Sequence, residues 1–218
     1  MMKNNKLKLI ISTIVILLPI LVGLILWDKL PEQVPTHWGA DGNPDGWSSK
    51  PFAVFGMPCI LLLLHGVCII ATSRDKKNAG QNLKLMGLTY WLVPVISIAA
   101  NGMVYATSIG KDVDIMLFLP IFMGVLFLFI GNYIPKCTQS RTVGIKIKWT
   151  LADEENWNAT HRFAGKIWVI GSVIILASAL LPANISVWVM IGVTFLMAIV
   201  PMVYSYCFYR KKKGKIDE

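Results

Sequence analysis

Charged side chains are scarce in this sequence, and acidic ones are scarcer than basic ones. Only 15% of the 218 residues are charged, against about a quarter in a typical soluble domain. Hydrophobic residues make up 55%. A soluble globule of this size cannot bury that much apolar side chain, because about half or more of its surface stays wetted. The composition excludes an ordinary soluble domain and indicates an integral membrane protein.

Histidine and cysteine are also few. The three histidines, His37, His65 and His161, lie in different segments, which argues against a zinc site built from two or three of them. The four cysteines fall in apolar runs or on the predicted cytoplasmic side, where disulfides are not expected. His65 and Asn101 are polar residues inside apolar runs that contain no acidic residue. Hydrogen bonding between helices is therefore their favoured role.

The apolar residues gather into runs long enough to cross a bilayer as helices, which takes about 20 residues each. The six runs are residues 9–27, 52–72, 86–107, 115–134, 163–182 and 185–208. The first is long for a signal peptide and no small-residue cleavage site follows it, so we expect a membrane anchor. The sequence predicts an all-α membrane protein, a single integral domain over residues 1–218 with six transmembrane helices.

Lysine and arginine fall on alternate sides of these runs. All 21 except Lys29, Lys50 and Lys111 lie in the N-terminal tail, the second and fourth loops, the start of the fifth run or the basic tail at 209–218. Because cytoplasmic segments hold the excess of these residues, both termini are predicted to be cytoplasmic. The net charge of +9 is then an orientation signal and an attraction to anionic lipid, and direct contact with nucleic acid is not expected.

The first long loop, residues 28–51, is predicted to lie outside the cell. Its density of Gly, Pro, Asn and Asp predicts ordered turns, and its tryptophans favour the membrane interface. The residues expected to form an external binding surface are His37, Trp38, Asp41, Asp45, Trp47 and Lys50.

Part of this loop also has the composition of a metal site. His37, Asp41 and Asp45 are candidate nitrogen and oxygen ligands of a divalent ion, which needs at least three ligands. Residues 41–46 fit the opening of a calcium loop, but Phe52 stands where its bidentate Glu is required. Turn chemistry is the simpler interpretation, so no cofactor is expected and a divalent metal is kept as the alternative.

The second long loop, residues 135–162, is predicted to be cytoplasmic. Thr150 followed by Asp153 resembles a capping box, so a short helix should begin there and lead into the fifth span. On that helix Glu154, Trp157 and His161 share one face. They could bind a partner or relay a proton, and the alternative is an interfacial helix with a solvated polar face.

At these two loops the sequence resembles the SdpI-type family of bacterial membrane immunity proteins. The front part, with His37-Trp38-Gly39 and Asp45-Gly46-Trp47, looks like the uncharacterised domain that often heads such proteins. The more specific motif lies in the back part and comprises Asn132, Tyr133, Pro135, Lys136, Trp149, Thr150, Glu154, Trp157, Thr160, His161 and Arg162. The chain departs from the family pattern where a proline is missing from residues 146–148 and where Asn156 replaces an expected apolar residue.

The resemblance implies a multi-pass protein of the bacterial cell membrane that protects its producer from a secreted peptide toxin. In the best-known member of that family the protein also senses the toxin and holds a cytoplasmic autorepressor at the membrane, so the resemblance implies this second role as well. The external loop would meet the toxin and the internal loop or tail the repressor, with membrane lipid as the remaining partner.

Two other function classes compete with a receptor. A membrane hydrolase or transferase, with or without a metal, would use His37 and the external aspartates, or Glu154 and His161, but it lacks a supported nucleophile. A transporter of a small solute or peptide is suggested by prolines within the spans and by two three-helix halves that would suit an inverted repeat. Spans without acidic residues argue against it.

Overall fold

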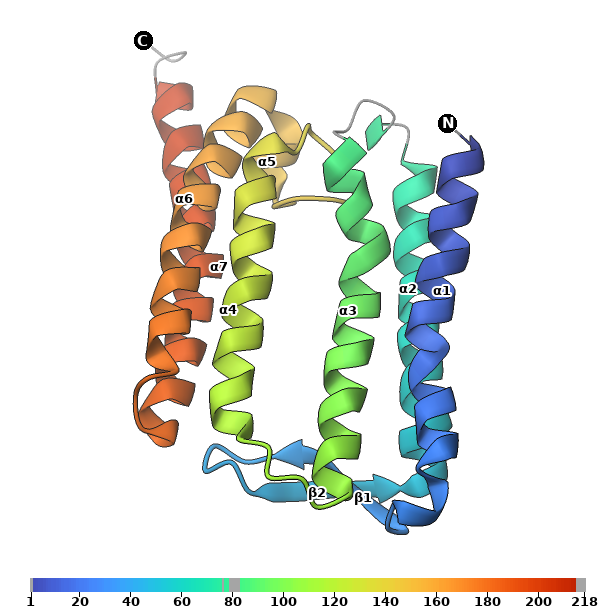
Figure 1. Cartoon of the computed structure of the whole chain (residues 1–218). Coiled ribbons are helices and arrows are strands. Elements are labelled where there is room, and N and C mark those ends of the chain that lie inside the picture. The colour runs from blue at the N-terminus through green and yellow to red at the C-terminus, as the bar shows by residue number, and fades with distance from the viewer. Residues whose placement is uncertain (1, 76, 79–82, 215–218) are drawn as a thin grey trace. The chain divides into compact units, whose positions relative to one another are not determined.

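The computed structural model describes residues 2–75, 77–78 and 83–214. Contacts divide the chain into two compact units, which we call unit 1 (Met1–Ala71 and Met86–Ile115) and unit 2 (Thr72–Leu85 and Met116–Glu218). Among the described residues, six helices are long and apolar enough to cross a membrane, three of them mainly in each unit (Figure 1). The six long apolar helices that the sequence predicts are therefore present, and each unit holds three of them.

Unit 1 contains three long helices and a β-hairpin. Its elements are α1 (Met2–Ile25), η1 (Trp27–Lys29), β1 (Gln33–Trp38), β2 (Pro44–Ser49), η2 (Phe52–Gly56), α2 (Met57–Arg74) and α3 (Leu83–Ser108). The π-helical turn η2 leads directly into α2, so together they form one apolar span. The hairpin lies where α1 ends, at the far end of unit 1 from the N-terminus (Figure 1).

The hairpin qualifies the all-α expectation. β1 and β2 pair antiparallel, with Val34 opposite Ser48 and Pro35 opposite Trp47. Gly42 takes a positive φ of 81° in the turn, a conformation that glycine adopts without strain, and the predicted ordered turns are present. The strands escaped prediction because their apolar alternation is interrupted by proline and glycine, which signal turns more strongly than strands.

A small apolar core fastens the hairpin to the helices of unit 1. Its buried residues are Leu30, Val34, Ala53, Val54, Val104 and Tyr105. Tyr105 also donates a hydrogen bond from its hydroxyl to the Pro19 carbonyl of α1, at 3.1 Å. The hairpin is therefore held as a fixed platform by side chains from η2 and α3.

Buried polar residues link the helices of unit 1. His65 Nε2 lies 3.0 Å from the Ser12 hydroxyl of α1, which confirms the predicted hydrogen bond between helices. Asn101 differs, because its amide donates to the Ser97 carbonyl one turn back on its own helix. The link from α3 to α1 is made by Ser97, whose hydroxyl donates to the Ile16 carbonyl at 3.0 Å.

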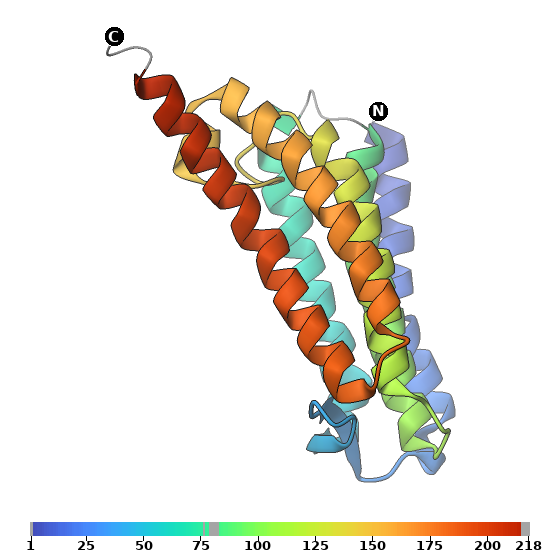
Figure 2. The ribbon, with the colours of Figure 1, turned by 90° about the vertical axis from the view of Figure 1, so that its left-hand side faces the viewer.

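Unit 2 is built around a long antiparallel helix pair. Its elements are α4 (Ile115–Tyr133), η4 (Ile134–Lys136), α5 (Lys148–Ala152), α6 (Glu154–Ser178) and α7 (Ala183–Gly214). Figure 2 shows α6 and α7 side by side, joined by a short turn. A small residue permits the close approach of α6 and α7, since a Cβ at Gly171 would lie 2.4 Å from Met197 Sδ. Gly131 does the same between α4 and α6, because a Cβ there would lie 2.8 Å from Trp168 Cβ.

The start of the fifth span differs from the prediction. The helix that begins near Thr150 ends at Ala152, and α6 begins afresh at Glu154. Asp153 is extended, with φ −140° and ψ 117°, and its carboxylate accepts a hydrogen bond from the Glu155 N–H at 3.0 Å. An Asp in this position satisfies a free N–H of the new helix, so it caps α6 in place of Thr150. From there the helix runs into the span, as expected.

Candidate functional site

The hairpin of unit 1 presents an exposed polar and aromatic surface. His37 Nδ1 and Asp45 Oδ1 form a hydrogen-bonded pair across the two strands, with 74% and 53% of their side chains exposed. Trp47, on the strand that carries Asp45, is 57% exposed. A hydrogen-bonded polar pair on a hairpin that also exposes an indole is suited to binding a ligand with polar and apolar parts.

The three predicted metal ligands are engaged in different ways. Asp41 accepts hydrogen bonds from the Asn43 side chain at 2.8 Å and from the Asn43 backbone N–H at 3.1 Å, and these bonds hold the pKa of Asp41 below its ordinary value. Asp45 is paired with His37. Within the described part of the chain, no three or more His, Cys, Asp or Glu are grouped so as to hold a metal ion.

Lys50 and Trp38 lie deeper than the surface predicted for them. Lys50 is only 7% exposed, and its ammonium pairs with Glu32 at 2.8 Å and lies 5.2 Å from the centre of the Trp27 ring. It therefore fastens the base of the hairpin. Trp38 is half-buried, and its buried Nε1 has no hydrogen-bond partner among the described residues.

In unit 2, the residues of the back motif form a stacked pair at the start of α6. The rings of Trp157 and His161 lie 4.0 Å apart at 19°, and both residues are 1% exposed or less. His161 Nε2 accepts from the Ile145 N–H at 2.9 Å, so Nδ1 carries the proton and donates to the Trp157 carbonyl at 2.8 Å. Both ring nitrogens are thus engaged by backbone groups.

The chain between α4 and α6 is folded onto this pair. Trp157 Nε1 donates to the Cys137 carbonyl at 2.8 Å. Gly144 has a φ of +110°, and a Cβ there would lie 2.6 Å from His161 Nε2. Thr150 is buried and donates its hydroxyl proton to the Ile145 carbonyl at 2.7 Å. These contacts give the 137–153 segment a defined shape without a long helix.

The predicted motif separates into buried and exposed members. Thr150, Trp157, Thr160 and His161 are buried and build the loop. Asn132, Pro135, Lys136, Glu154 and Arg162 are exposed, and Tyr133 and Trp149 are half-buried. Glu154, Trp157 and His161 all lie on α6, as predicted, but only Glu154 is exposed. The reason is that the 137–153 segment covers the two rings but not the carboxylate.

One residue that the sequence analysis missed is Asp75, in the connection between α2 and α3. Its carboxylate accepts hydrogen bonds from the Ser140 hydroxyl at 2.9 Å, the Arg141 N–H at 2.8 Å and the Lys77 N–H at 3.1 Å. Partial burial raises the pKa of Asp75, but these hydrogen bonds outweigh it and hold the pKa below its ordinary value. One feature of the sequence could have pointed to Asp75, because it is the only acidic residue among the lysines and the arginine of residues 73–85. We call Asp75 and its partners Ser140, Arg141 and Lys77 the Asp75 clamp.

Asn156, which the sequence marks only as a departure from the family pattern, takes a defined role in the structure. It is fully buried, donates to the Ser205 carbonyl of α7 at 3.0 Å, and accepts from the Ser205 and Thr160 hydroxyls at 2.7 and 2.9 Å. Its polar side chain thus replaces apolar packing with hydrogen bonds between α6 and α7. Nearby, Lys212 of α7 bridges Asp153 at 2.8 Å and Glu155 at 2.9 Å, and its hydrogen bond to Asp153 lowers the pKa of that carboxyl.

Comparison with known proteins agrees with this division of the chain. Residues 14–62, which include the hairpin, match a domain of unknown function (DUF1648). Over 213 residues the chain is 28% identical to "Immunity protein SdpI" of Bacillus subtilis (strain 168), an alignment that covers 98% of this chain and 99% of that protein. No solved structure matches the chain. Residues 136–205 match the SdpI/YfhL protein family, and the resemblance to SdpI-type proteins of the bacterial membrane is confirmed.

Proposed function

We propose that this chain is a membrane immunity protein that protects its producer from a secreted peptide toxin. The observation that carries the proposal is similarity to an immunity protein over nearly the whole of both chains. The similarity extends through both the hairpin and the loop before α6, so a shared activity can use both regions.

The proposed orientation places both termini in the cytoplasm and the hairpin outside. It rests on the lysines and arginines, of which all but Lys29, Lys50 and Lys111 fall on one predicted side. Three spans, α2, α3 and α4, separate the hairpin from η4 in chain order. An odd number of crossings puts the hairpin and the 137–153 segment on opposite faces of the membrane.

In this proposal the toxin meets His37, Asp45 and Trp47. These three side chains are exposed on a hairpin whose base is fixed by Lys50 and by the apolar core of unit 1. A fixed platform loses little entropy when it binds a ligand, and an exposed tryptophan beside a hydrogen-bonding pair is a common centre of binding energy.

On the other face, we propose that the exposed members of the back motif and the tail meet a cytoplasmic repressor. Lys136, Glu154 and Arg162 are exposed around the folded 137–153 segment, and α7 ends in Lys211, Lys212 and Lys213. Signalling between the faces requires two arrangements of the helices that toxin binding favours unequally.

The direct test is deletion of the gene in its own organism, followed by growth in supernatant from the parent culture. We expect the deletion strain to be killed and the parent to survive, with survival restored when this chain alone is supplied from a plasmid. A deletion strain as resistant as its parent would overturn the proposal.

A further inference from the structure

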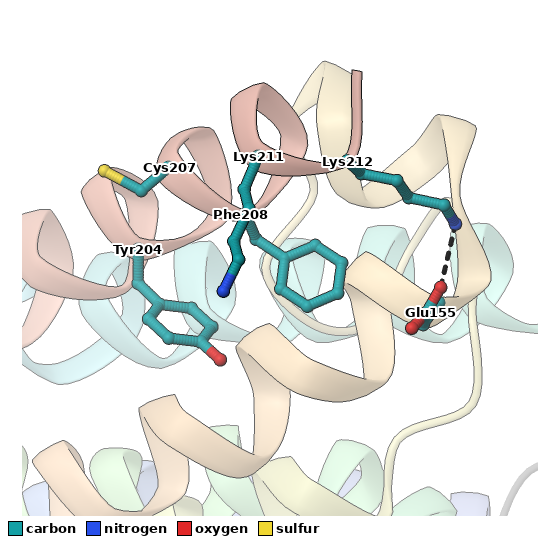
Figure 3. Close-up of a pocket in the computed structure, with 6 residues that line it drawn as sticks. All are labelled: Glu155, Tyr204, Cys207, Phe208, Lys211 and Lys212. Carbon is teal, nitrogen blue, oxygen red and sulfur yellow. Dashed lines mark hydrogen bonds and ion pairs between the residues drawn. The ribbon is translucent and has the colours of Figure 1, made fainter. Parts of the chain in front are cut away.

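A pocket in unit 2 adjoins the proposed repressor-binding surface and shares Lys211 and Lys212 with it. It has a volume of about 600 Å³ and lies where the start of α6 faces the last turns of α7. The lining residues are Glu155, Tyr204, Cys207, Phe208, Lys211 and Lys212 (Figure 3). Its wall therefore combines two aromatic rings with charged groups.

The two lysines of this pocket differ in their ion pairing. Lys212 points toward Glu155 and binds both Glu155 and Asp153 (Figure 3). Lys211 forms no ion pair with any residue that the structure describes, and its side chain runs between Tyr204 and Phe208 with the ammonium on the Tyr204 side (Figure 3). Because Lys212 is held by two carboxylates, Lys211 is the ammonium of this pocket that is available to an anionic ligand.

The position of the pocket along α7 places it at the level of lipid headgroups. The helix has 32 residues, a length of about 48 Å at the usual rise, against a hydrocarbon core of about 30 Å. Its apolar run ends at Phe208 and is followed by Arg210 and three lysines. Tyrosine at such a boundary typically lies at the interface, and lysine extends toward the headgroups.

We propose that this pocket binds the phosphate group of an anionic phospholipid. The Lys211 ammonium pairs with the phosphate, the Tyr204 hydroxyl donates a hydrogen bond to it, and the acyl chains lie along the apolar surface of α7 beyond Phe208. That surface is available, since Val203 and Leu196 are 54% and 55% exposed. A lipid is the occupant that fits best, because the Lys211 ammonium lies beside the Tyr204 and Phe208 rings and next to apolar helix surface. At the membrane boundary, a phospholipid offers both a phosphate for the ammonium and acyl chains for that surface.

The test uses the full chain in nanodiscs made from equal amounts of phosphatidylcholine and phosphatidylglycerol. Native mass spectrometry then counts the lipids that stay bound after the disc is removed. We expect retained phosphatidylglycerol in the unmodified chain and about tenfold less in Lys211→Gln, because a hydrogen-bonded ion pair is lost. Tyr204→Phe should lose about threefold, because only a neutral donor is removed.

Lys213→Gln is the matched control. It removes the same charge from the same tail, but Lys213 does not line the pocket. Full retention in Lys211→Gln, or equal losses in Lys211→Gln and Lys213→Gln, overturns the site. Displacement of the lipid by inorganic phosphate, with equal phosphate binding in discs of phosphatidylcholine alone, overturns the lipid assignment in favour of a soluble anion.

Discussion

Removal of the His37–Asp45 pair by substitution tests whether the hairpin recognises the toxin. Replacing His37 by alanine removes an exposed pair, which contributes about 1 kcal/mol or less to folding stability. We therefore expect His37→Ala to insert and fold normally. The toxin dose that cells survive should fall about tenfold, the effect of losing one central contact of a binding surface.

The measurement for this variant is survival across dilutions of the parent supernatant, with membrane levels checked by immunoblot. Ser49→Ala is the control, since Ser49 is exposed on the same strand as Asp45. Unchanged survival of His37→Ala, or an equal fall in the control, would remove the His37–Asp45 pair from toxin recognition.

Substitution of Gly144 by alanine tests whether the 137–153 segment packs tightly on Trp157 and His161. An alanine there must adopt a φ of +110° and place its Cβ 2.6 Å from His161 Nε2. Strain and overlap together should cost about 3 kcal/mol of folding stability. The matched variant is Gly110→Ala, because Gly110 also has a positive φ of 74° but nothing lies within 4 Å of its added Cβ.

Thermal unfolding in detergent compares the two glycine variants. Gly110→Ala should lose only the conformational cost, about 1 kcal/mol, so its midpoint should fall less than that of Gly144→Ala. Equal falls would mean that the segment is not packed tightly on His161.

The Asp75 clamp joins the connection after α2 to the segment after η4, and it should make that junction sensitive to acid. Since the pKa of Asp75 is lowered by folding, the clamp contributes stability above the unfolded pKa, near 4. That contribution is lost as the pH falls through the lower folded pKa. Asp75→Asn should lower the free energy of unfolding by about 1 kcal/mol near neutral pH. The variant should then lose less stability than the unmodified chain when the pH is lowered.

Stability against pH can be followed by thermal unfolding of the same detergent preparation. Asp112→Asn serves as the comparison, because Asp112 is exposed and lies outside the clamp. If the unfolding temperature of Asp75→Asn falls as steeply below pH 4 as that of the unmodified chain, the clamp is not the cause of the acid sensitivity.

The long helices were predictable because the thickness of the bilayer fixes the length of each apolar run. The hairpin was not, since only its turn residues give a local signal and the pairing of Val34 with Ser48 depends on the core beneath it. The break at Asp153 was missed because Thr150 and Asp153 are both good N-caps, and the choice depends on how the loop folds onto Trp157.

The candidate site was predictable in composition but not in placement. Burial separates His161 from Glu154, although both share a helical face, because residues from the preceding loop cover one and not the other. Likewise, Asn156 donates a hydrogen bond to the carbonyl of Ser205, which is 49 residues away in the chain. A single sequence does not indicate which distant residues form such a hydrogen bond. Long-range packing thus decides which motif residues support the fold and which remain free for a partner.

For the molecule as a whole, the proposed function depends on which side of the membrane each surface faces. The charge distribution predicts the hairpin outside and the end of α7 inside. In a variant whose native cysteines are replaced, we expect Ser49→Cys to react with a membrane-impermeant maleimide in intact cells. Gly214→Cys should react only after the cells are permeabilised.

Both positions suit this experiment, since Ser49 is exposed on β2 and nothing lies within 4 Å of a Cβ added at Gly214. Labelling of Gly214→Cys but not Ser49→Cys in intact cells would place the hairpin in the cytoplasm, where a secreted toxin does not meet it. Labelling of both in intact cells would mean an even number of crossings between them. The five spans between the two positions, α2, α3, α4, α6 and α7, would then not all cross, and the two proposed surfaces would lose their separation by the membrane.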